Sequence, residues 1–251
     1  MNFWGGFKMY YQRYRDNVDT TLDLIFTREA HKIETAGAEL AKTLEGDGLL
    51  YVFGCGHSHM LAEELFYRAG GLAPVYPIFE TAAMLHEGAA KSSQVERMSG
   101  YARHVIARYP IGPKDCLLIA STSGINPFCM EMAELARARG AKVIGISSFA
   151  YLEKPSRQRE GKHLPEFCDI CVDNHVPVGD ATVTVCDDGT KAGPVSTIAT
   201  LAIANSIVLE ACEILRSHGV EPKVFHSGNC PGADEYNAGL LQEYMPRIRH
   251  L

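Results

Sequence analysis

The sequence predicts an α/β fold with three layers, α/β/α, built on a mostly parallel five-stranded sheet with extra helices at both ends. Two observations indicate this class. Short apolar runs of strand length alternate with helical patterns, and two of these runs lead directly into turn residues that open a helix. Such alternation favours right-handed crossovers and a parallel sheet covered on both faces. With 251 residues and 46% hydrophobic content, the chain can bury a large core without disulfides or metals.

The expected elements follow in order along the chain. Apolar residues keep a helical spacing over about 8–44, and Gly46-Asp47-Gly48 ends that helix. Next come strand 49–53, helix 58–69, strand 74–79, helix about 92–109, strand 116–120, helix 127–139, strand 142–147, a polar loop at 151–165 whose basic residues are solvated, and a strand at about 169–173. Helices at 196–217 and about 233–249 complete the chain. We therefore expect one domain over 1–251, with a helical N-terminal extension at about 8–45.

The segment after strand 116–120 has the composition of an anion-binding turn. It reads Ser121-Thr122-Ser123-Gly124-Ile125-Asn126-Pro127. The hydroxyl groups can donate hydrogen bonds, Gly124 permits a tight turn, and Pro127 fits the first helical position, which needs no N–H. Free N–H groups at the start of the following helix would then face an anion, for which phosphate is the best match. Simple helix capping, with Asn126 as the cap, explains the same residues and stays an alternative here.

A second junction of the same kind follows strand 49–53. It reads Gly54-Cys55-Gly56-His57-Ser58-His59 and leads into a helical pattern. A dinucleotide-binding loop, G-x-G-x-x-G, would have a third glycine, which none of His59, Met60 and Leu61 supplies, and an acidic residue that closes the next strand. A dehydrogenase of the Rossmann type is therefore disfavoured, although Glu80 after the second strand keeps it from being excluded.

These two loops resemble those of the SIS (sugar isomerase) domain of phosphosugar isomerases and phosphosugar-binding regulators. The first is similar to the family's G-x-G-x-S loop, and Ser121-Thr122-Ser123-Gly124 to its S-x-S-G phosphate loop. Residues 141–147 resemble the next strand, and Pro194-Val195-Ser196-Thr197 the entry to a long helix. The resemblance spans most of the chain and is greatest to uncharacterised bacterial SIS proteins of about this length, described as phosphosugar isomerases. It implies a flavodoxin-like SIS domain.

The resemblance also implies how a sugar phosphate is held. Hydroxyl and amide side chains of both loops and of the long helix would bind its phosphate: Ser58, Ser121, Thr122, Ser123, Asn126, Ser196 and Thr197. Asn126 stands where the family usually has threonine. An amide can still donate a hydrogen bond to a phosphate oxygen, so this departure affects the expected affinity more than the expected class of ligand.

Aldose–ketose isomerisation moves a proton between adjacent carbons, which needs a base and a group that assists ring opening. Glu64 takes the place of the catalytic glutamate of phosphoheptose isomerases. His86 and His226 resemble histidines of arabinose-5-phosphate isomerases. Alternative interpretations stay open, because Glu64 can pair with Arg68 one turn on and a lone loop histidine is often a surface residue.

No metal or cofactor is assigned from the sequence. Met60 stands where the phosphoheptose isomerases carry a metal-site histidine. His59 and Glu63 have the i,i+4 spacing that two ligands on one helix can use, but this spacing alone does not identify a site. Cys168-x-x-Cys171 has no second pair, and the eight cysteines are scattered, so we expect reduced thiols.

Composition indicates which classes of partner and which cellular location to expect. The net charge of −6 argues against a nucleic-acid surface. Residues 1–7 are too short and uncharged for a signal peptide, and no run of 18 apolar residues occurs. We therefore expect a cytoplasmic protein without nucleic-acid or membrane partners. The apolar helices at 8–44 and 198–215 exceed what a five-stranded sheet needs for cover, which favours a homodimer or homotetramer.

Two classes of function remain. The first is an isomerase acting on a sugar phosphate or amino-sugar phosphate, and the second is a phosphosugar sensor or regulatory subunit without turnover. Deglycation or ether cleavage of a phosphorylated amino sugar would use the same pocket and base. The sequence contains no helix-turn-helix pattern of the kind attached to SIS regulators, which favours the enzyme.

Overall fold

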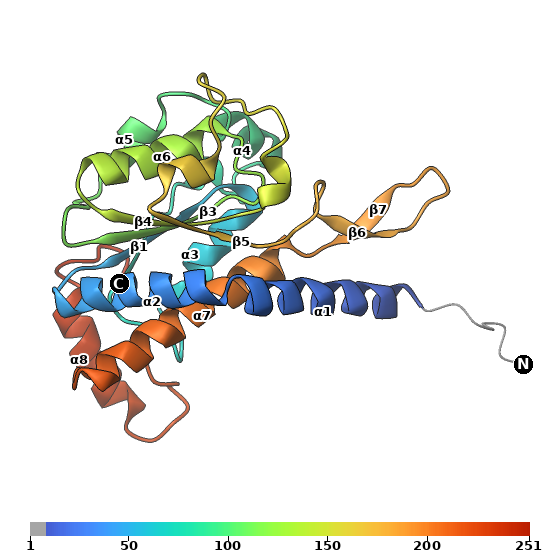
Figure 1. Ribbon diagram of the computed structural model, residues 1–251. Coiled ribbons are helices and arrows are strands. Elements are labelled where there is room, and N and C mark those ends of the chain that lie inside the picture. Colours follow the sequence, from blue (N-terminus) through green and yellow to red (C-terminus); the bar gives the residue numbers. More distant parts are fainter. Residues whose placement is uncertain (1–8) are drawn as a thin grey trace, which may run out of the picture.

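The structure, a computed structural model, describes residues 9–251 and has a parallel five-stranded sheet at its centre (Figure 1). The strand order is β2-β1-β3-β4-β5. The strands are β1 (Leu50–Gly54), β2 (Val75–Pro77), β3 (Cys116–Ala120), β4 (Lys142–Ser147) and β5 (Ile170–Asp173). The predicted fold class is confirmed. The chain runs outward in opposite directions from β1 and β3, so the loops after these two strands lie at the switch point where open α/β sheets bind ligands.

Helices cover both faces of the sheet (Figure 1). One layer contains α4 (Ala89–Val95), α5 (Ala102–Ile106) and α6 (Pro127–Ala138), and the other contains α2 (Ala30–Glu45), α3 (Met60–Leu65) and α7 (Ser196–Ser217). Strand residues alternate between the two layers. Phe53 and Ile119 belong to the core under α5 and α6, whereas Val52 and Leu118 belong to the core under α2 and α7. Helix α8 (Ala233–Tyr244) joins the first core through Leu240.

The N-terminal helical extension is two helices rather than one. Helix α1 (Tyr10–Arg28) and α2 meet at Glu29, whose backbone leaves the helical region with φ −105° and ψ 3°. The backbone hydrogen bonds from Glu29 N to Ile25 O and from Ile33 N to Glu29 O continue across the break. The apolar spacing is continuous there, so it predicted a single helix. The predicted start at residue 8 and the interpretation of residues 1–7 lie outside the described residues.

Other boundaries also differ from those predicted. The helix expected over 92–109 is split into α4 and α5 at Gly100, which has a φ of +81° and donates its N–H to the Glu131 carboxylate. The last helix ends at Tyr244 instead of about 249. A two-stranded antiparallel hairpin, β6 (Ala181–Thr184) and β7 (Lys191–Pro194), was not predicted. It projects beside α1 (Figure 1), which holds it through the hydroxyl of Tyr14 donating to Pro194 O at 2.8 Å.

Helix α7 is the one helix within residues 9–251 that is long and apolar enough to cross a membrane by length and composition, and 44% of its apolar window is buried inside the protein. It packs along α2 and contributes Ile203, Ile207 and Leu215 to the core on that face of the sheet. This packing explains why a helix of a globular domain has such an apolar sequence.

Candidate functional site

Glycines shape the first loop of the switch point. A Cβ on Gly54 would lie 2.3 Å from the carbonyl oxygen of Ser58, so only glycine fits where the chain folds back over the end of β1. Gly56 has a φ of +55° and begins the 3₁₀ helix η1 (Gly56–His59). The close approach places Ser58 directly above the carboxyl end of the strand.

The second loop, residues 121–126, is anchored on the neighbouring strand. Ser121 N donates to Ile146 O at 3.0 Å, which aligns the start of the loop with β4. Gly124 has a φ of +59°, and a Cβ there would lie 2.7 Å from Ser147 Oγ. The Ser121 hydroxyl oxygen accepts from Gly124 N at 3.2 Å, and that of Thr122 accepts from Asn174 Nδ2 at 3.2 Å. Because the protein uses these oxygens as acceptors, both hydroxyl protons are available to an anion.

Hydroxyl groups from three separate segments meet in one narrow pocket at the switch point. Ser58 comes from η1, Thr122 from the second loop, and Thr197 from the first turn of α7. The lining is completed by His57, Met60, Leu61, Ser196, Thr200 and Leu201. Of the seven predicted phosphate-binding residues, the structure thus brings Ser58, Thr122, Ser196 and Thr197 together. Ser121, Ser123 and Asn126 belong to the same loop as Thr122 but do not line this pocket.

The first turn of α7 already has a carboxylate cap. Asp180 Oδ1 accepts from the backbone N–H groups of Val195 and Ser196 at 2.9 Å each, and its Oδ2 accepts from Ser196 Oγ at 2.6 Å. The Ser196 hydroxyl proton is therefore engaged, and Thr197 is the stronger candidate for a phosphate contact. Sequence reasoning missed Asp180 because it precedes the helix by a whole hairpin.

Asn126 is buried and held from both sides. Its Nδ2 donates to Glu96 Oε1 at 3.0 Å, and its Oδ1 accepts from Arg157 Nη1 at 2.9 Å. Arg157 lies in the loop expected to be merely solvated, and its backbone N–H also donates to Ile125 O. Arg157 is exposed, as expected, but it is not only solvated, because this loop folds back onto the 121–126 loop. Burial raises the pKa of the Glu96 carboxyl above its ordinary value.

Glu64 lies between α3 and α7. Its Oε1 accepts from Asn205 Nδ2 at 3.1 Å and from Arg68 Nη1, so the alternative pairing with Arg68 is present. Residues four apart share one face of a helix. Glu64 therefore lies on the same face of α3 as the pocket residue Met60, one turn further on. Asn205 has the same relation to the pocket residue Leu201 on α7. The carboxylate faces α7 rather than the two loops and is not part of the pocket lining.

His86 meets the preceding carboxylate, Glu63, on another side of α3. Glu63 Oε1 lies 3.1 Å from His59 Nε2 and 3.4 Å from His86 Nε2. The two imidazole rings stand edge to face with centroids 5.1 Å apart. The structure thus brings together two histidines and a carboxylate, a set that can bind a metal ion.

His226 lies apart from this cluster and from the pocket. Its ring stacks on Tyr236 with centroids 4.0 Å apart, and its backbone N–H donates to Asn237. It lines a separate cleft together with Arg68, the ion-pair partner of Glu64. His226 is therefore related to Glu64 only through Arg68, and the two residues do not line the same pocket.

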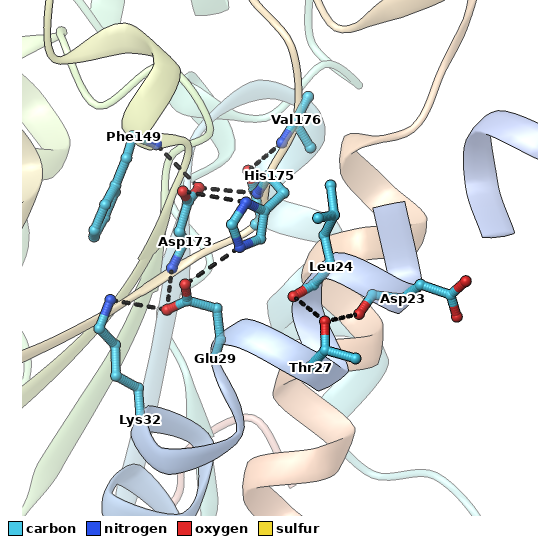
Figure 2. Close-up of polar contacts among 10 residues, drawn as sticks. Asp23, Leu24, Thr27, Glu29, Lys32, Phe149, Asp173, His175 and Val176 are labelled. Atoms are coloured by element: carbon cyan, nitrogen blue, oxygen red, sulfur yellow. Dashed lines mark hydrogen bonds and ion pairs between the residues drawn. The ribbon is translucent and has the colours of Figure 1, made fainter. Parts of the chain in front are cut away.

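A second cluster of titratable groups explains the break between α1 and α2 (Figure 2). Glu29 turns inward, where its carboxylate lies 2.8 Å from Lys32 Nζ and 3.2 Å from His175 Nε2. Asp173, at the end of β5, accepts from the backbone N–H groups of Phe149 and His175. These carboxylates have cationic and N–H partners within the protein, so we interpret the cluster as structural.

Buried thiols lie beneath the loops. Cys55, in the first loop, and Cys129, on α6, have sulfur atoms 3.6 Å apart. Burial and the hydrogen bond between these thiols raise the pKa of Cys55 well above its ordinary value. A thiol kept protonated in this way is a poor nucleophile. We therefore interpret Cys55 and Cys129 as core residues beneath the loops.

Comparison with known proteins identifies the family. The SIS domain family model matches residues 13–148. A UPF0309 protein of Geobacillus thermodenitrificans is 42% identical over 94% of this chain and 95% of its own length. A UPF0309 protein of Listeria monocytogenes is 43% identical over 94% of this chain and 96% of its own length.

Solved structures show the same fold at low sequence identity. A phosphoheptose isomerase from Francisella tularensis superposes with a TM-score of 0.53 at 17% identity, covering 81% of this chain and 96% of that chain. This likeness supports the architecture described above. The solved structure shows the fold, and the family model that matches residues 13–148, more than half of the chain, shows that the chain belongs to the SIS domain family.

Proposed function

We propose that this protein binds a phosphorylated sugar and isomerises it between its aldose and ketose forms. The observation that carries the proposal is the meeting of Ser58, Thr122 and Thr197 in one pocket at the β1/β3 switch point. Hydroxyl protons from three segments can surround a phosphate, and hydrogen bonds to a charged group are each worth about 1.5–3 kcal/mol. Arg157, held against Asn126 at the neighbouring loop, adds positive charge on that side.

The proposed chemistry requires a groove to open between α3 and α7, beyond the pocket, to hold the carbon chain of the sugar. Glu64 lies one helical turn beyond the pocket, and Asn205 and Arg68 orient its carboxylate. A substrate with its phosphate in the pocket and its carbon chain along this groove would present its reacting carbons to Glu64, which we assign as the base. We keep His86 and His226 as candidates for assisting ring opening, which requires a movement of either residue toward the groove.

The family supports a phosphosugar ligand. The Francisella tularensis neighbour is a phosphoheptose isomerase, and another neighbour, from Neisseria gonorrhoeae, is also a phosphoheptose isomerase, with a TM-score of 0.52 at 16% identity. We extend their class of ligand, and not their particular sugar, to this chain. We also propose that the protein is cytoplasmic and forms a homodimer or homotetramer.

A phosphosugar sensor or regulatory subunit is the second candidate. The observation that favours it is that Glu64 already has two protein partners, so its carboxylate serves the packing of α3 against α7 even without catalysis. Amino-sugar phosphate deglycation or ether cleavage would use the same groove and differs only in the bond that breaks.

Binding and turnover can be tested separately. Calorimetry with phosphorylated pentoses, hexoses, heptoses and amino sugars, each beside its unphosphorylated form, should give binding only for phosphorylated compounds. Proton NMR in deuterated water should then show exchange at the carbon next to the carbonyl of the bound sugar. Binding without exchange supports the sensor, and absence of binding across the panel contradicts the proposal as a whole.

Glu64→Gln separates the catalytic assignment from binding. The amide keeps an oxygen that can accept from Asn205, so the α3–α7 contact is largely retained while the base is removed. We expect exchange to fall below detection and affinity to stay within a few-fold. Glu34→Gln, on the exposed face of α2, is the matched control and should change neither. Exchange that persists in Glu64→Gln rules Glu64 out as the base.

A further inference from the structure

Three side chains from two segments point at one another beside the first loop. His59 ends η1, Glu63 lies one turn on in α3, and His86 comes from the segment after β2. One ligand atom from each, the two imidazole nitrogens and a carboxylate oxygen, lie within 4.8 Å of one another. Sequence spacing could suggest the first two as a pair, but only the fold brings His86 to them.

The protonation of His59 follows from its partners. Its Nδ1 contacts the carbonyl oxygen of Gly56, which can only accept, so Nδ1 carries a proton. In the neutral imidazole the other nitrogen, Nε2, then has a lone pair, and this lone pair faces the Glu63 carboxylate oxygen at 3.1 Å. Two lone pairs do not attract each other. The contact needs a cation between the two atoms or a second proton on the ring.

A metal ion fits this geometry without charging either ring. His86 Nε2 faces the same carboxylate oxygen at 3.4 Å and can donate to it in the neutral tautomer, so protons alone would need one imidazolium, at His59, with its ring centroid 5.1 Å from that of His86. One divalent ion instead leaves both rings neutral. Four ligands arranged tetrahedrally about 2.0–2.1 Å from zinc lie about 3.3 Å from one another. The two measured separations, 3.1 and 3.4 Å, bracket that value.

The surroundings match those of a zinc site with an open position. The side chain of His59 is only 5% exposed, and its bond to Gly56 O fixes the ring in the way that a metal-bound histidine is usually fixed. Glu63 and His86 are 44% and 59% exposed, so the far side of the cluster is open to water. The cluster around Glu29 differs, because there Lys32 already supplies a cation at 2.8 Å.

We propose that His59, Glu63 and His86 bind one divalent transition-metal ion, preferentially zinc, and leave a fourth position open to water or to a ligand oxygen. Two imidazoles with one carboxylate form a donor set that zinc accepts readily, and three protein ligands with an open position are typical of reactive rather than structural zinc sites. The site lies beside the proposed phosphosugar pocket, since His57 and Ser58, which line that pocket, immediately precede His59.

Zinc binding can be measured on the full chain without any sugar, so its outcome is independent of the proposed function. The protein is dialysed against a chelator and then titrated with zinc in competition with a chromophoric chelator. We expect one zinc per chain at this site. Glu63→Gln and His86→Ala remove exposed ligands, and each should weaken zinc binding at least tenfold. Circular dichroism melting checks that both variants remain folded.

Matched controls separate this site from other zinc ligands. His31 and Glu34 form another exposed His–Glu pair on a helix, with 4.0 Å between His31 Nδ1 and Glu34 Oε2, and His31→Ala should leave zinc affinity unchanged. Serine substitutions at Cys168 and Cys171 should also leave it unchanged. Cobalt(II) in place of zinc should give a visible absorption spectrum that is lost in Glu63→Gln.

Two results would overturn the proposal. One is zinc affinity that is the same in Glu63→Gln and in the wild type, or that depends on the cysteines instead. The other is an NMR spectrum in which both ring nitrogens of His59 carry protons at neutral pH and do not change when zinc is added. The second result would identify the cluster as a hydrogen-bonded imidazolium–carboxylate group.

Discussion

Glu63 and Glu64 are adjacent in the sequence, yet their carboxylates serve different sides of α3. Glu63 Oε1 lies 3.1 Å from His59 Nε2, and Glu64 Oε1 lies 3.1 Å from Asn205 Nδ2 on α7. Successive residues of a helix point about 100° apart. One carboxylate therefore belongs to the histidine cluster and the other to the contact between α3 and α7. A single helical turn thus borders two chemically distinct regions, one with imidazole groups and one with hydroxyl and amide groups.

The hydroxyls of the pocket should contribute directly to phosphosugar affinity. Thr122→Val and Thr197→Val preserve side-chain shape and remove one donor each. We expect each to weaken binding by about 1–3 kcal/mol, the scale of a lost hydrogen bond to a charged group. Calorimetry with a phosphosugar identified in the ligand panel measures the effect. Thr35→Val, on the exposed surface of α2, is the control, and equal affinity in all three variants would remove these hydroxyls from the site.

The half-buried Glu96 carboxyl should make the free energy of unfolding depend on pH. Because burial raises its pKa in the folded protein above the ordinary value of 4.5, the folded chain binds this proton more tightly than the unfolded chain does. Its contribution to the free energy of unfolding is present at low pH and is lost as the pH rises through the raised pKa.

Glu96→Gln removes this dependence and keeps an oxygen for Asn126. We expect the variant to gain stability over the wild type as the pH rises from about 4.5 toward neutral. Urea unfolding at several pH values measures the difference. A parallel pH profile for the two proteins would show that Glu96 does not titrate with a raised pKa.

The Glu29 cluster should stabilise the junction of α1 and α2. Glu29→Ala removes the carboxylate that contacts His175 Nε2 and accepts from the backbone N–H of Asp173, although His175 Nδ1 keeps Asp173 at 3.5 Å. Removing one partner of a fully buried pair costs about 3–5 kcal/mol. We expect about 2–3 kcal/mol here, because Lys32 is 40% exposed and regains water. Chemical denaturation measures the loss, and Glu34→Ala, whose side chain is 64% exposed, should change stability by less than about 0.5 kcal/mol.

The predicted assembly can be tested on the exposed apolar residues of two packed helices. Phe26 on α1 is 50% exposed and Leu209 on α7 is 67% exposed, and these helices contact each other. We expect light scattering to give a homodimer or homotetramer. A charge buried in an apolar interface is unfavourable, so Leu209→Glu should shift the protein toward the monomer. A wild-type monomer at micromolar concentration would contradict the predicted assembly.

The sheet and its two loops could be predicted because their signals are local. An apolar strand followed by Gly54-x-Gly56 or by Ser121–Gly124 contains, within a few residues, the reasons for its conformation. The break at Glu29 could not be predicted in this way. Glu29 contacts His175, which follows β5, lies far along the chain and reaches Glu29 only once the sheet has formed.

The candidate site likewise has features that local sequence predicts and features that it does not. Loop composition and family resemblance were enough to predict hydroxyls at Ser58, Thr122 and Thr197. The contacts that decide which groups are free could not be predicted, because Asp180, Arg157 and Asn205 act across the fold. Glu64 was chosen over Glu63 by alignment to a family helix, and the different neighbours of the two carboxylates are visible only in three dimensions.

Asp180 links the β6–β7 hairpin to the first turn of α7. This residue stands at the root of the hairpin and fastens the first turn of α7 through Ser196, next to the pocket residue Thr197. At the same root, Pro194, the last residue of β7, accepts a hydrogen bond from the Tyr14 hydroxyl of α1. A partner that binds α1 or the base of the hairpin would therefore act on the segment that caps α7 beside the pocket.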